Sequence, residues 1–419
     1  MNPPARTFVA LIACLAGLWA VWTQVAAQSD SAPPPAQAAA SAAAPAAATP
    51  MPPAAFEDAV ARAGEKLFSD ASAVVGDAPR ELVIDPLIDA ASGAQTVGSV
   101  QMGEQLAAIV AAQHPNWTVK PLTRETLGNG PLLLIGTLTA VNTKNDTSAV
   151  ADAFRIWLTL VDLKTGRIVA KQLDRATTDS VNAEPTKYFR DSPTWHKDRT
   201  VAAYINSCQI NSKVGDPIDP AYMMRLPAAA LLNEAIIAYA QNRIADASRL
   251  YRHASLVADA DDLRVLNGLY LTSWRLGRKP EATQSFAKIV GAGLAAKQLP
   301  LKLLFTPGTT NFVPTADLKT QYALWLQQIS QQVAQRNVCL KVVGHTSRTG
   351  TAAANDILSE RRASVVAHSL ERQARGLANH LTSQGVGWRE TLIGLGTDDL
   401  RDALDRRVEF RVVNCAATS

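Results

Sequence analysis

Cysteine, histidine and catalytic signatures are scarce in this 419-residue chain. It has four cysteines and six histidines, with no Cys-x-x-Cys pair and no His/Cys cluster along the sequence. Zinc binding and thioredoxin-like redox chemistry are therefore not expected. The motifs H-E-x-x-H, G-x-S-x-G and G-x-x-x-x-G-K-[ST] do not occur, so the common hydrolase and nucleotide-binding signatures are missing. We predict a non-enzymatic protein without catalytic residues, metal or cofactor.

The chain also lacks an excess of charge of one sign. Lysine and arginine number 41, aspartate and glutamate number 37, and the net charge is +4. Nucleic-acid-binding domains carry a basic patch or stripe. We therefore predict no nucleic-acid partner.

The few cysteines leave the disulfide pattern open. Cys14 lies in the N-terminal apolar segment, so Cys208, Cys339 and Cys415 remain, an odd number. An oxidising compartment would allow one disulfide and one spare thiol. Cys339 and Cys415 each lie in or beside a predicted C-terminal strand, which makes them the candidate pair. Buried free thiols are the alternative, because cysteine is commonly buried.

Residues 1–27 have the composition of a secretory signal peptide. A basic start precedes an unbroken apolar run over residues 8–22, and small residues follow at 25–27. The run is shorter than the about 20 apolar residues that span a bilayer, but an uncleaved inner-membrane anchor at 8–22 remains an alternative. Lipid attachment at Cys14 is a third option. It is disfavoured because only six apolar residues precede Cys14 and the apolar run continues beyond it. We expect a periplasmic protein of the Gram-negative envelope.

Two segments follow the signal. Residues 28–55 are almost wholly Ala, Pro, Ser, Gln and Thr, a composition that cannot bury a core and predicts a linker. Residues 56–180 predict an α/β domain with helices over 56–80 and 97–113. Its strand candidates, which alternate or are rich in Val, Ile and Leu, are 81–86, 116–122, 131–141, 154–163 and 163–170. This pattern resembles the small α/β domains of envelope assembly proteins, such as lipoprotein activators of peptidoglycan synthases and the curli-secretion family, and we expect a binding module.

Residues 181–226 predict a polar, turn-rich connector. Its aromatic residues Tyr188, Phe189 and Trp195 form either a partner surface or, as isolated aromatics usually do, buried contacts that fasten the connector to a neighbouring domain.

An internal repeat occupies residues 227–295. Ala247, Tyr251 and Ala254 are matched 35 positions later by the residues Ala282, Phe286 and Ile289. The i, i+4, i+7 spacing places each trio on one helix face. The spacing is similar to that of tetratricopeptide repeats, but only about two repeats are visible, fewer than a free-standing solenoid needs. We expect the segment to pack against a neighbour and to present a surface to envelope proteins; a plain helical spacer is the alternative.

Residues 296–415 predict a C-terminal domain of alternating strands and helices. The expected strands are 301–307, 338–345, 390–396 and 406–413, and the expected helices are 316–334 and one that starts near Ala352. Several pieces of this region resemble the OmpA-like, peptidoglycan-associating domain family: Phe305 with Gly308, Gly344-His345-Thr346 with Gly350, Asn355-x-x-Leu358-Ser359-x-x-Arg362-Ala363-x-x-Val366, and Asp405-Arg406-Arg407-Val408-Glu409.

The resemblance implies a fold and a ligand. The fold would be βαβαββ, which makes the whole chain an α+β multidomain protein. The ligand would be peptidoglycan, through the zwitterionic diaminopimelate of its stem peptide. The site residues carried over by position are Arg362, Ser347, Thr346, Asn355, Leu358 and Thr306. Arg362 would bind a carboxylate in a charge-assisted bond.

Two of these positions depart from the family pattern. Ser347 stands where an aspartate normally takes the ligand's amine, and Thr306 stands where another acid is common. The anionic half of the recogniser is therefore absent, and restoring it by Ser347→Asp should raise binding. The alternative for Arg362 is a simple ion pair with Glu360 or Asp356, of the kind common on surfaces.

A further departure is length. Glu371-Arg372-Gln373-Ala374 repeats Glu360-Arg361-Arg362-Ala363 eleven positions later. Eleven residues are three helical turns, so the pattern predicts a helix about 16 Å longer than usual, whose extension would be a docking surface.

These observations predict a periplasmic, outer-membrane-associated protein that binds peptidoglycan and scaffolds protein partners. The alternative is an OmpA-like fold reused as a protein-docking module of an envelope or secretion assembly, without peptidoglycan binding.

Overall fold

The computed structural model describes residues 52–415, except 143, 145–149, 196–197, 210–211 and 375. The predicted signal peptide or anchor and nearly all of the predicted linker lie outside these residues. None of the helices in the described part is long and apolar enough to cross a membrane.

The first half of the chain builds a five-stranded sheet. Its strands are β1 (Arg80–Ile84), β2 (Trp117–Lys120), β3 (Leu132–Val141), β4 (Ala153–Asp162) and β5 (Arg167–Thr177). Their order in the sheet is β2-β1-β3-β4-β5. β1 is parallel to both of its neighbours, and the β3–β4 and β4–β5 pairs are antiparallel. A strand lies in each region where one was predicted.

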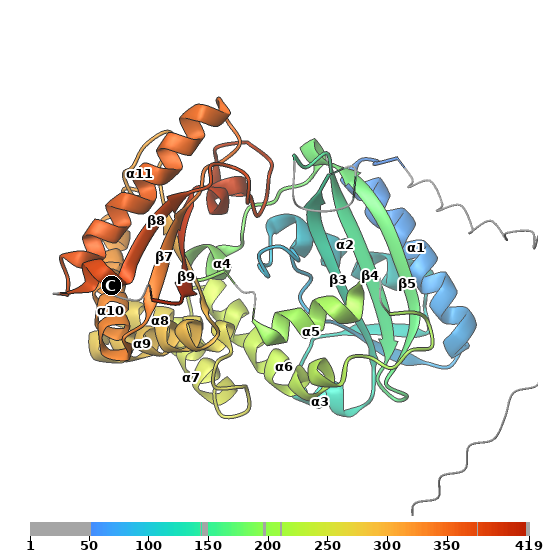
Figure 1. Ribbon diagram of the computed structural model, residues 1–419. Coiled ribbons are helices and arrows are strands. Elements are labelled where there is room, and N and C mark those ends of the chain that lie inside the picture. The colour runs from blue at the N-terminus through green and yellow to red at the C-terminus, as the bar shows by residue number, and fades with distance from the viewer. Residues whose placement is uncertain are drawn as a thin grey trace, which may run out of the picture. The chain divides into compact units, whose positions relative to one another are not determined.

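Helices cover both faces of this sheet, and β3 is therefore buried at every position. Leu134 and Leu138 face a core made with α1 (Phe56–Val75) and α2 (Val97–Gln113). Leu133 and Ile135 face a second core made with the helices α5 (Arg199–Cys208) and α6 (Pro220–Ala240) (Figure 1). A near-continuous apolar strand is the pattern expected of a strand buried on both faces.

The connector is more ordered than the sequence predicted. It contains α4 (Lys187–Asp191) and α5, and the short helices α3 (Arg124–Gly128) and η1 (Thr178–Ser180) precede it. Tyr188 and Phe189 are buried in the core of the helical segment, and Tyr188 Oη donates to the Arg264 carbonyl at 2.5 Å. The aromatic side chains therefore fasten the connector to a neighbour instead of forming a partner surface.

The repeat helices share a core with the C-terminal domain. α6 packs on α7 (Ile244–Ala254) and α8 (Leu263–Arg275) packs on α9 (Lys279–Ala295). All six repeat positions singled out in the sequence are fully buried. Phe286 of α9 stacks on Trp325 of α10 with ring centroids 5.4 Å apart. One hydrophobic core thus extends across the predicted boundary at residue 296, from the helical segment into the C-terminal domain.

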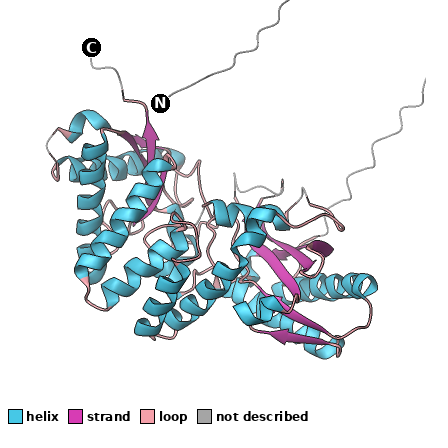
Figure 2. Cartoon of the chain, turned by 90° about the horizontal axis from the view of Figure 1, so that it is seen from below, coloured by secondary structure: helices cyan, strands magenta, loops and turns pink. Residues whose placement is uncertain are grey.

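The C-terminal domain has the βαβαββ order that the family resemblance implies, but its third strand, β8, lies at residues 381–385, where no strand was predicted. Its elements are β6 (Gln298–Leu304), α10 (Ala316–Arg336), β7 (Cys339–Gly344), α11 (Ala352–Glu371), β8 (Leu381–Gly385) and β9 (Arg407–Val413), with the 3-10 turns η2 (Leu377–His380) and η3 (Leu400–Asp405). The sheet order is β6-β9-β7-β8. Figure 2 shows the strands of the two sheets as separate groups among the helices. The α+β, multidomain prediction is confirmed.

The predicted helix extension is wrong. α11 ends at Glu371, so the repeated Glu-Arg-Gln-Ala segment lies at and beyond its end. Beyond that end, Gly376 precedes η2 with a φ of +81°, a left-handed conformation that suits glycine and does not continue a helix. The chain then enters β8, which is parallel to β7.

The strand predicted at residues 390–396 is also wrong. Gly394 and Gly396 have positive φ angles of 74° and 67°, which breaks the extended backbone. The N–H groups of Leu392 and Gly394 donate to the Asp405 carboxylate at 2.7 and 2.8 Å instead of to a neighbouring strand. The alternating pattern of this segment therefore belongs to a loop.

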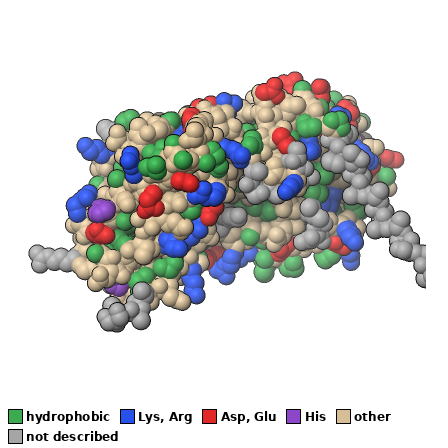
Figure 3. Space-filling model, turned by 45° about the horizontal axis from the view of Figure 1, so that its top comes forward, with side chains coloured by type: hydrophobic (Ala, Val, Ile, Leu, Met, Phe, Trp, Pro, Cys, Tyr) green, Lys and Arg blue, Asp and Glu red, His purple; other side chains and the backbone are tan. Residues whose placement is uncertain are grey.

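Charged side chains of both signs are interspersed on the face drawn in Figure 3. This matches the near balance of acidic and basic residues in the sequence.

Candidate functional site

The loop between β7 and α11 forms one wall of a cavity of about 470 Å³. Thr351 begins the helix as its N-cap and accepts from the Ala354 N–H at 3.3 Å. The lining includes the predicted site residues Thr346, Ser347, Asn355, Leu358 and Arg362. The structure therefore brings five of the six predicted residues to one cavity.

Arg362 lines this cavity and is fully buried. Its Nε donates to the Thr309 carbonyl at 2.9 Å, and its Nη1 and Nη2 donate to His345 O and Thr306 O at 3.0 and 3.1 Å. The guanidinium also lies 5.1 Å from the centroid of the Phe305 ring. Burial, with a smaller contribution from the charge of Arg406, lowers the pKa of Arg362 to about 10.

The alternative ion pairs predicted for Arg362 are wrong. Asp356 pairs with Arg389 at 2.7 Å, and Glu360 accepts from Ser383 Oγ at 2.8 Å. The three carbonyl oxygens leave two of the five guanidinium N–H groups without a partner among the described residues. Arg362 is thus a buried cation that no carboxylate of the described chain contacts, and it lines the cavity.

An acidic residue from a distant part of the chain bonds to the loop, although it is not among the residues that line this cavity. Asp398 accepts from the Ser347 hydroxyl and, at 2.6 Å, from the Thr349 hydroxyl. Its backbone has a φ of 56°, and the Asp402 carboxylate accepts from its N–H at 3.0 Å. Arg406 Nη1 lies 3.5 Å from its carboxylate. A carboxylate therefore lies beside Ser347 although the sequence motif has none.

Sequence reasoning missed Asp398 because it lies 51 positions from Ser347. The only signal was local: Asp398 and Asp399 come just after the stretch 390–396, which the sequence predicts as a strand. Interpreted as a loop, the same stretch would have placed an acidic pair near the carboxyl end of β7.

The other predicted residues have supporting positions. Asn355 Nδ2 donates to the carbonyls of Thr349 and Thr351 at 2.7 and 3.0 Å and so shapes the loop. The Thr346 N–H donates to the Gly387 carbonyl at 3.0 Å. Thr306 meets Arg362 through its carbonyl and is not among the residues that line this cavity.

His345 lies beneath the loop with 1% of its surface exposed. Burial and the charge of Arg407 lower its pKa to about 4, so the imidazole is neutral at pH 7. Its Nε2 lies 3.5 Å from Glu409. For Glu409, burial acts to raise the pKa, but contacts with His345 and Arg407 outweigh it and hold the pKa below its usual range.

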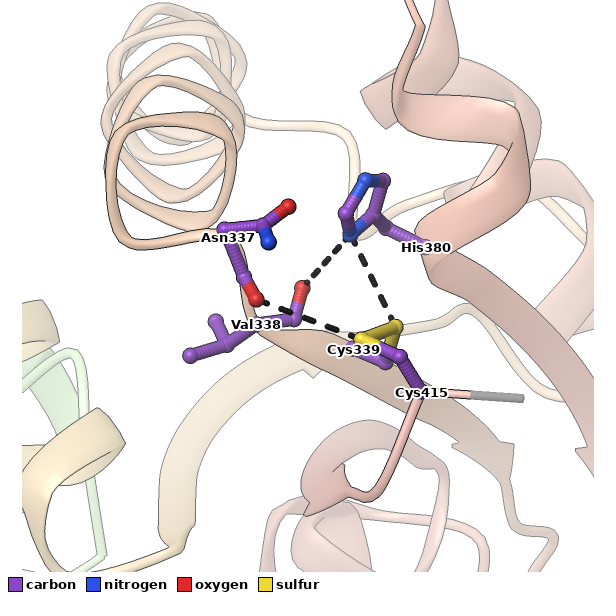
Figure 4. The surroundings of a disulfide bond; sticks show 5 residues. All are labelled: Asn337, Val338, Cys339, His380 and Cys415. Atoms are coloured by element: carbon purple, nitrogen blue, oxygen red, sulfur yellow. Dashed lines mark hydrogen bonds between the residues drawn. A yellow bond between two sulfur atoms is a disulfide. The ribbon is translucent and has the colours of Figure 1, made fainter. Parts of the chain in front are cut away.

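The structure contains a disulfide between Cys339 and Cys415, the pair singled out in the sequence (Figure 4). Cys208 is a buried free thiol. His380 lies beside the disulfide, with its Nδ1 3.6 Å from Cys339 Sγ. A His/Cys cluster, which is not visible along the sequence, therefore exists in the folded chain.

Comparison with known proteins assigns the C-terminal domain. Residues 304–402 match the model of the OmpA family, and this part of the chain is an OmpA family domain. No curated protein matches the chain.

Several solved bacterial structures are similar to part of this chain. The peptidoglycan-associated lipoprotein from Burkholderia pseudomallei is 24% identical, covers 28% of this chain and 92% of its own, and has a TM-score of 0.24. The periplasmic domain of Helicobacter pylori MotB is 20% identical over 28% and 74%, with a TM-score of 0.23. The cell wall anchor of the T6SS from Pseudomonas aeruginosa is 20% identical over 31% and 96%, with a TM-score of 0.24.

Proposed function

We propose that the C-terminal domain binds the stem peptide of peptidoglycan non-covalently, and that the protein is a non-enzymatic component of the periplasmic envelope. One observation carries the proposal. A buried cation without a carboxylate partner in the described chain, Arg362, lines the same cavity as the loop hydroxyls that hold the Asp398 carboxylate.

These two charges suit a zwitterion. A carboxylate of diaminopimelate would accept from the N–H groups that Arg362 has left over, in a charge-assisted bond. Its ammonium group would lie against Asp398, whose carboxylate Ser347 and Thr349 orient. The OmpA family match over residues 304–402 supports this ligand class.

A second candidate is a protein-docking module without peptidoglycan binding. The observation that favours it is the use of Arg362 inside the domain, where its guanidinium already joins three carbonyl groups of two loops. In this function Arg362 holds the domain together, and the helical segment and the α/β domain contact envelope partners.

Co-sedimentation of the full chain with isolated sacculi distinguishes the two candidates. Asp398→Asn removes the charge that would meet the ammonium group. We expect a loss of tenfold to a hundredfold in affinity, because a hydrogen bond to a charged group contributes about 1.5–3 kcal/mol.

The matched control is Asp399→Asn. Asp399 is the next residue in the chain. Its carboxylate pairs with Arg401 at 2.7 Å and, unlike that of Asp398, does not bond to the loop hydroxyls. We expect this variant to pellet like the wild type. Failure of the wild type to pellet would refute peptidoglycan binding, and equal loss in both variants would remove Asp398 from the site.

A further inference from the structure

A group of metal-binding side chains lies at the opposite end of β7 from the cavity loop. Cys339 opens β7, Cys415 follows β9, and His380 ends η2. The two sulfur atoms and one ring nitrogen of His380 all lie within 4.8 Å of one another. Figure 4 shows that nitrogen, Nδ1, facing the disulfide.

The spacing of these atoms fits a tetrahedral zinc ion. His380 Nδ1 lies 3.6 Å from Cys339 Sγ. Zinc with bonds of about 2.3 Å to sulfur and about 2.0–2.1 Å to nitrogen separates two such ligand atoms by about 3.5 Å. The distance between His380 Nδ1 and Cys339 Sγ is therefore already the one that zinc requires. Cys415 Sγ lies within 4.8 Å of the same nitrogen. The two sulfur atoms must separate to about 3.8 Å, with the same zinc–sulfur bonds.

The two sulfur atoms can separate through a movement of Cys415. Cys339 is 5% exposed and fixed within β7. Cys415 is exposed and lies beyond the end of β9. Once the disulfide is reduced, Cys415 can move away from Cys339 without disturbing the sheet.

The histidine must change its tautomer. His380 Nδ1 also lies 3.1 Å from the Val338 carbonyl, a contact that requires a proton on this nitrogen. As a zinc ligand, Nδ1 offers its lone pair, so the proton resides on Nε2 and the contact with Val338 is lost.

We propose that Cys339, Cys415 and His380 of the reduced chain bind Zn²⁺ as a Cys₂His site, with a water molecule as the fourth ligand. A dithiol reductant supplies two electrons and two protons to open the disulfide, and zinc binding then releases the two thiol protons. In the reverse direction a protein disulfide accepts the two electrons, the sulfur–sulfur bond re-forms, and Zn²⁺ leaves. The site alternates between a disulfide and a zinc-bound dithiolate.

Cobalt titration of the full chain tests this site, with Co²⁺ as the spectroscopic probe. All samples carry Cys208→Ala, so that only the paired cysteines can contribute thiolate. The reduced chain should bind one equivalent of Co²⁺ with a sulfur-to-cobalt charge-transfer band, and excess Zn²⁺ should abolish that band. The oxidised chain should show no band.

Three variants define the ligands. His380→Gln should weaken cobalt binding at least about tenfold, since even outer-shell changes cost that much. Cys415→Ser, at an exposed position that leaves the core intact, should abolish the band. His368→Gln is the control, because His368 lies on α11 and its Nδ1 bonds to the Ser364 carbonyl.

Two outcomes would overturn the proposal. One is a reduced chain that binds no more Co²⁺ than the oxidised chain. The other is an unchanged affinity in His380→Gln, which would leave a simple dithiol without a histidine ligand.

Discussion

At the scale of single residues, the site depends on two side chains that meet across 51 positions. Ser347 donates its hydroxyl to the Asp398 carboxylate, and the φ of 56° at Asp398 and the bond from its N–H to Asp402 fix the approach. The loop therefore has a carboxylate at its surface without carrying one in its own sequence.

This arrangement reverses the effect expected of Ser347→Asp. The sequence alone predicts tighter binding, because the substitution restores an acid to the loop. The structure places the new carboxylate against Asp398, where like charges repel. We expect binding to sacculi at pH 7 to fall by about tenfold, or about 1.4 kcal/mol.

The control for this variant is Thr351→Asp. Thr351 is the exposed N-cap of α11, a position that aspartate also favours, so the net charge changes equally without a contact to Asp398. Tighter binding by Ser347→Asp at pH 7 would show that Asp398 does not serve the site.

Lys302 predicts how stability depends on pH. Burial lowers its pKa to about 7 from a usual 10.5, and the charge of Asp191 offsets only part of this. Below pH 7 the ammonium is charged in both states, so the full cost of burying it is present. Between about pH 7 and 10.5 the unfolded chain binds more protons, so the free energy of unfolding rises with pH, by up to about 1.4 kcal/mol per unit.

Urea unfolding at several pH values measures this slope. In Lys302→Met the contribution to the slope between pH 7 and 10.5 should disappear, and the free energy of unfolding at pH 6 should not fall, because well-packed apolar replacements of buried charges are often neutral or stabilising. Lys341→Met, at a partly exposed position of β7, should keep the wild-type slope. An equal pH dependence of the free energy of unfolding in all three proteins would show that Lys302 does not cause it.

At the scale of elements, α11 lies directly on the backbone of β7 and β8. A Cβ atom on Gly344 would lie 2.0 Å from the Ser359 carbonyl oxygen, and one on Gly385 would lie 2.3 Å from the Glu360 nitrogen. Both glycines therefore let the helix approach closely enough for Arg362 to reach the loop carbonyls.

Gly344→Ala should separate α11 from the sheet. The clash is with helix backbone, which cannot rotate away, so we expect a loss of roughly 2–3 kcal/mol in the free energy of unfolding together with loss of binding to sacculi. Gly103→Ala is the matched control, because the nearest atom to its added Cβ, in Leu87, lies at 3.8 Å. In the middle of α2 this change should stabilise the protein by about 0.5–1 kcal/mol. Wild-type stability in Gly344→Ala would contradict the close packing.

At the scale of the whole molecule, the repeat helices and the OmpA family domain share one hydrophobic core, so we expect them to unfold together. Phe286 of α9 stacks on Trp325 of α10, and Trp325 Nε1 donates to Tyr270 Oη of α8 at 2.8 Å. All three side chains belong to one hydrophobic core. A substitution that destabilises the helical segment should therefore also destabilise the C-terminal sheet.

Hydrogen exchange read peptide by peptide tests this coupling. Phe286→Ala should cost about 3–5 kcal/mol and speed exchange in α10 and β7. Phe68→Ala removes an equally buried ring from the separate core under the N-terminal sheet and should speed exchange in α1 and α2 but not in β7. Unchanged exchange of α10 in Phe286→Ala would show that the two parts unfold independently.

Local pattern determined much of this architecture from the sequence. The helix at 97–113, the strands of the N-terminal sheet and the buried repeat positions all follow from hydrophobic periodicity, which every packed helix or strand must show. The cluster of loop residues around Arg362 also followed from motif spacing, because those residues lie within about five turns of one strand end.

Only the tertiary structure decided which distant groups meet. It placed Asp398 at the loop, gave Arg362 three carbonyl partners, brought His380 to the disulfide, and ended α11 at Glu371. Hydrogen bonds and ion pairs depend on distances of about 3 Å in space. Sequence periodicity records which face of an element is buried, but it carries no information about which far segment covers that face.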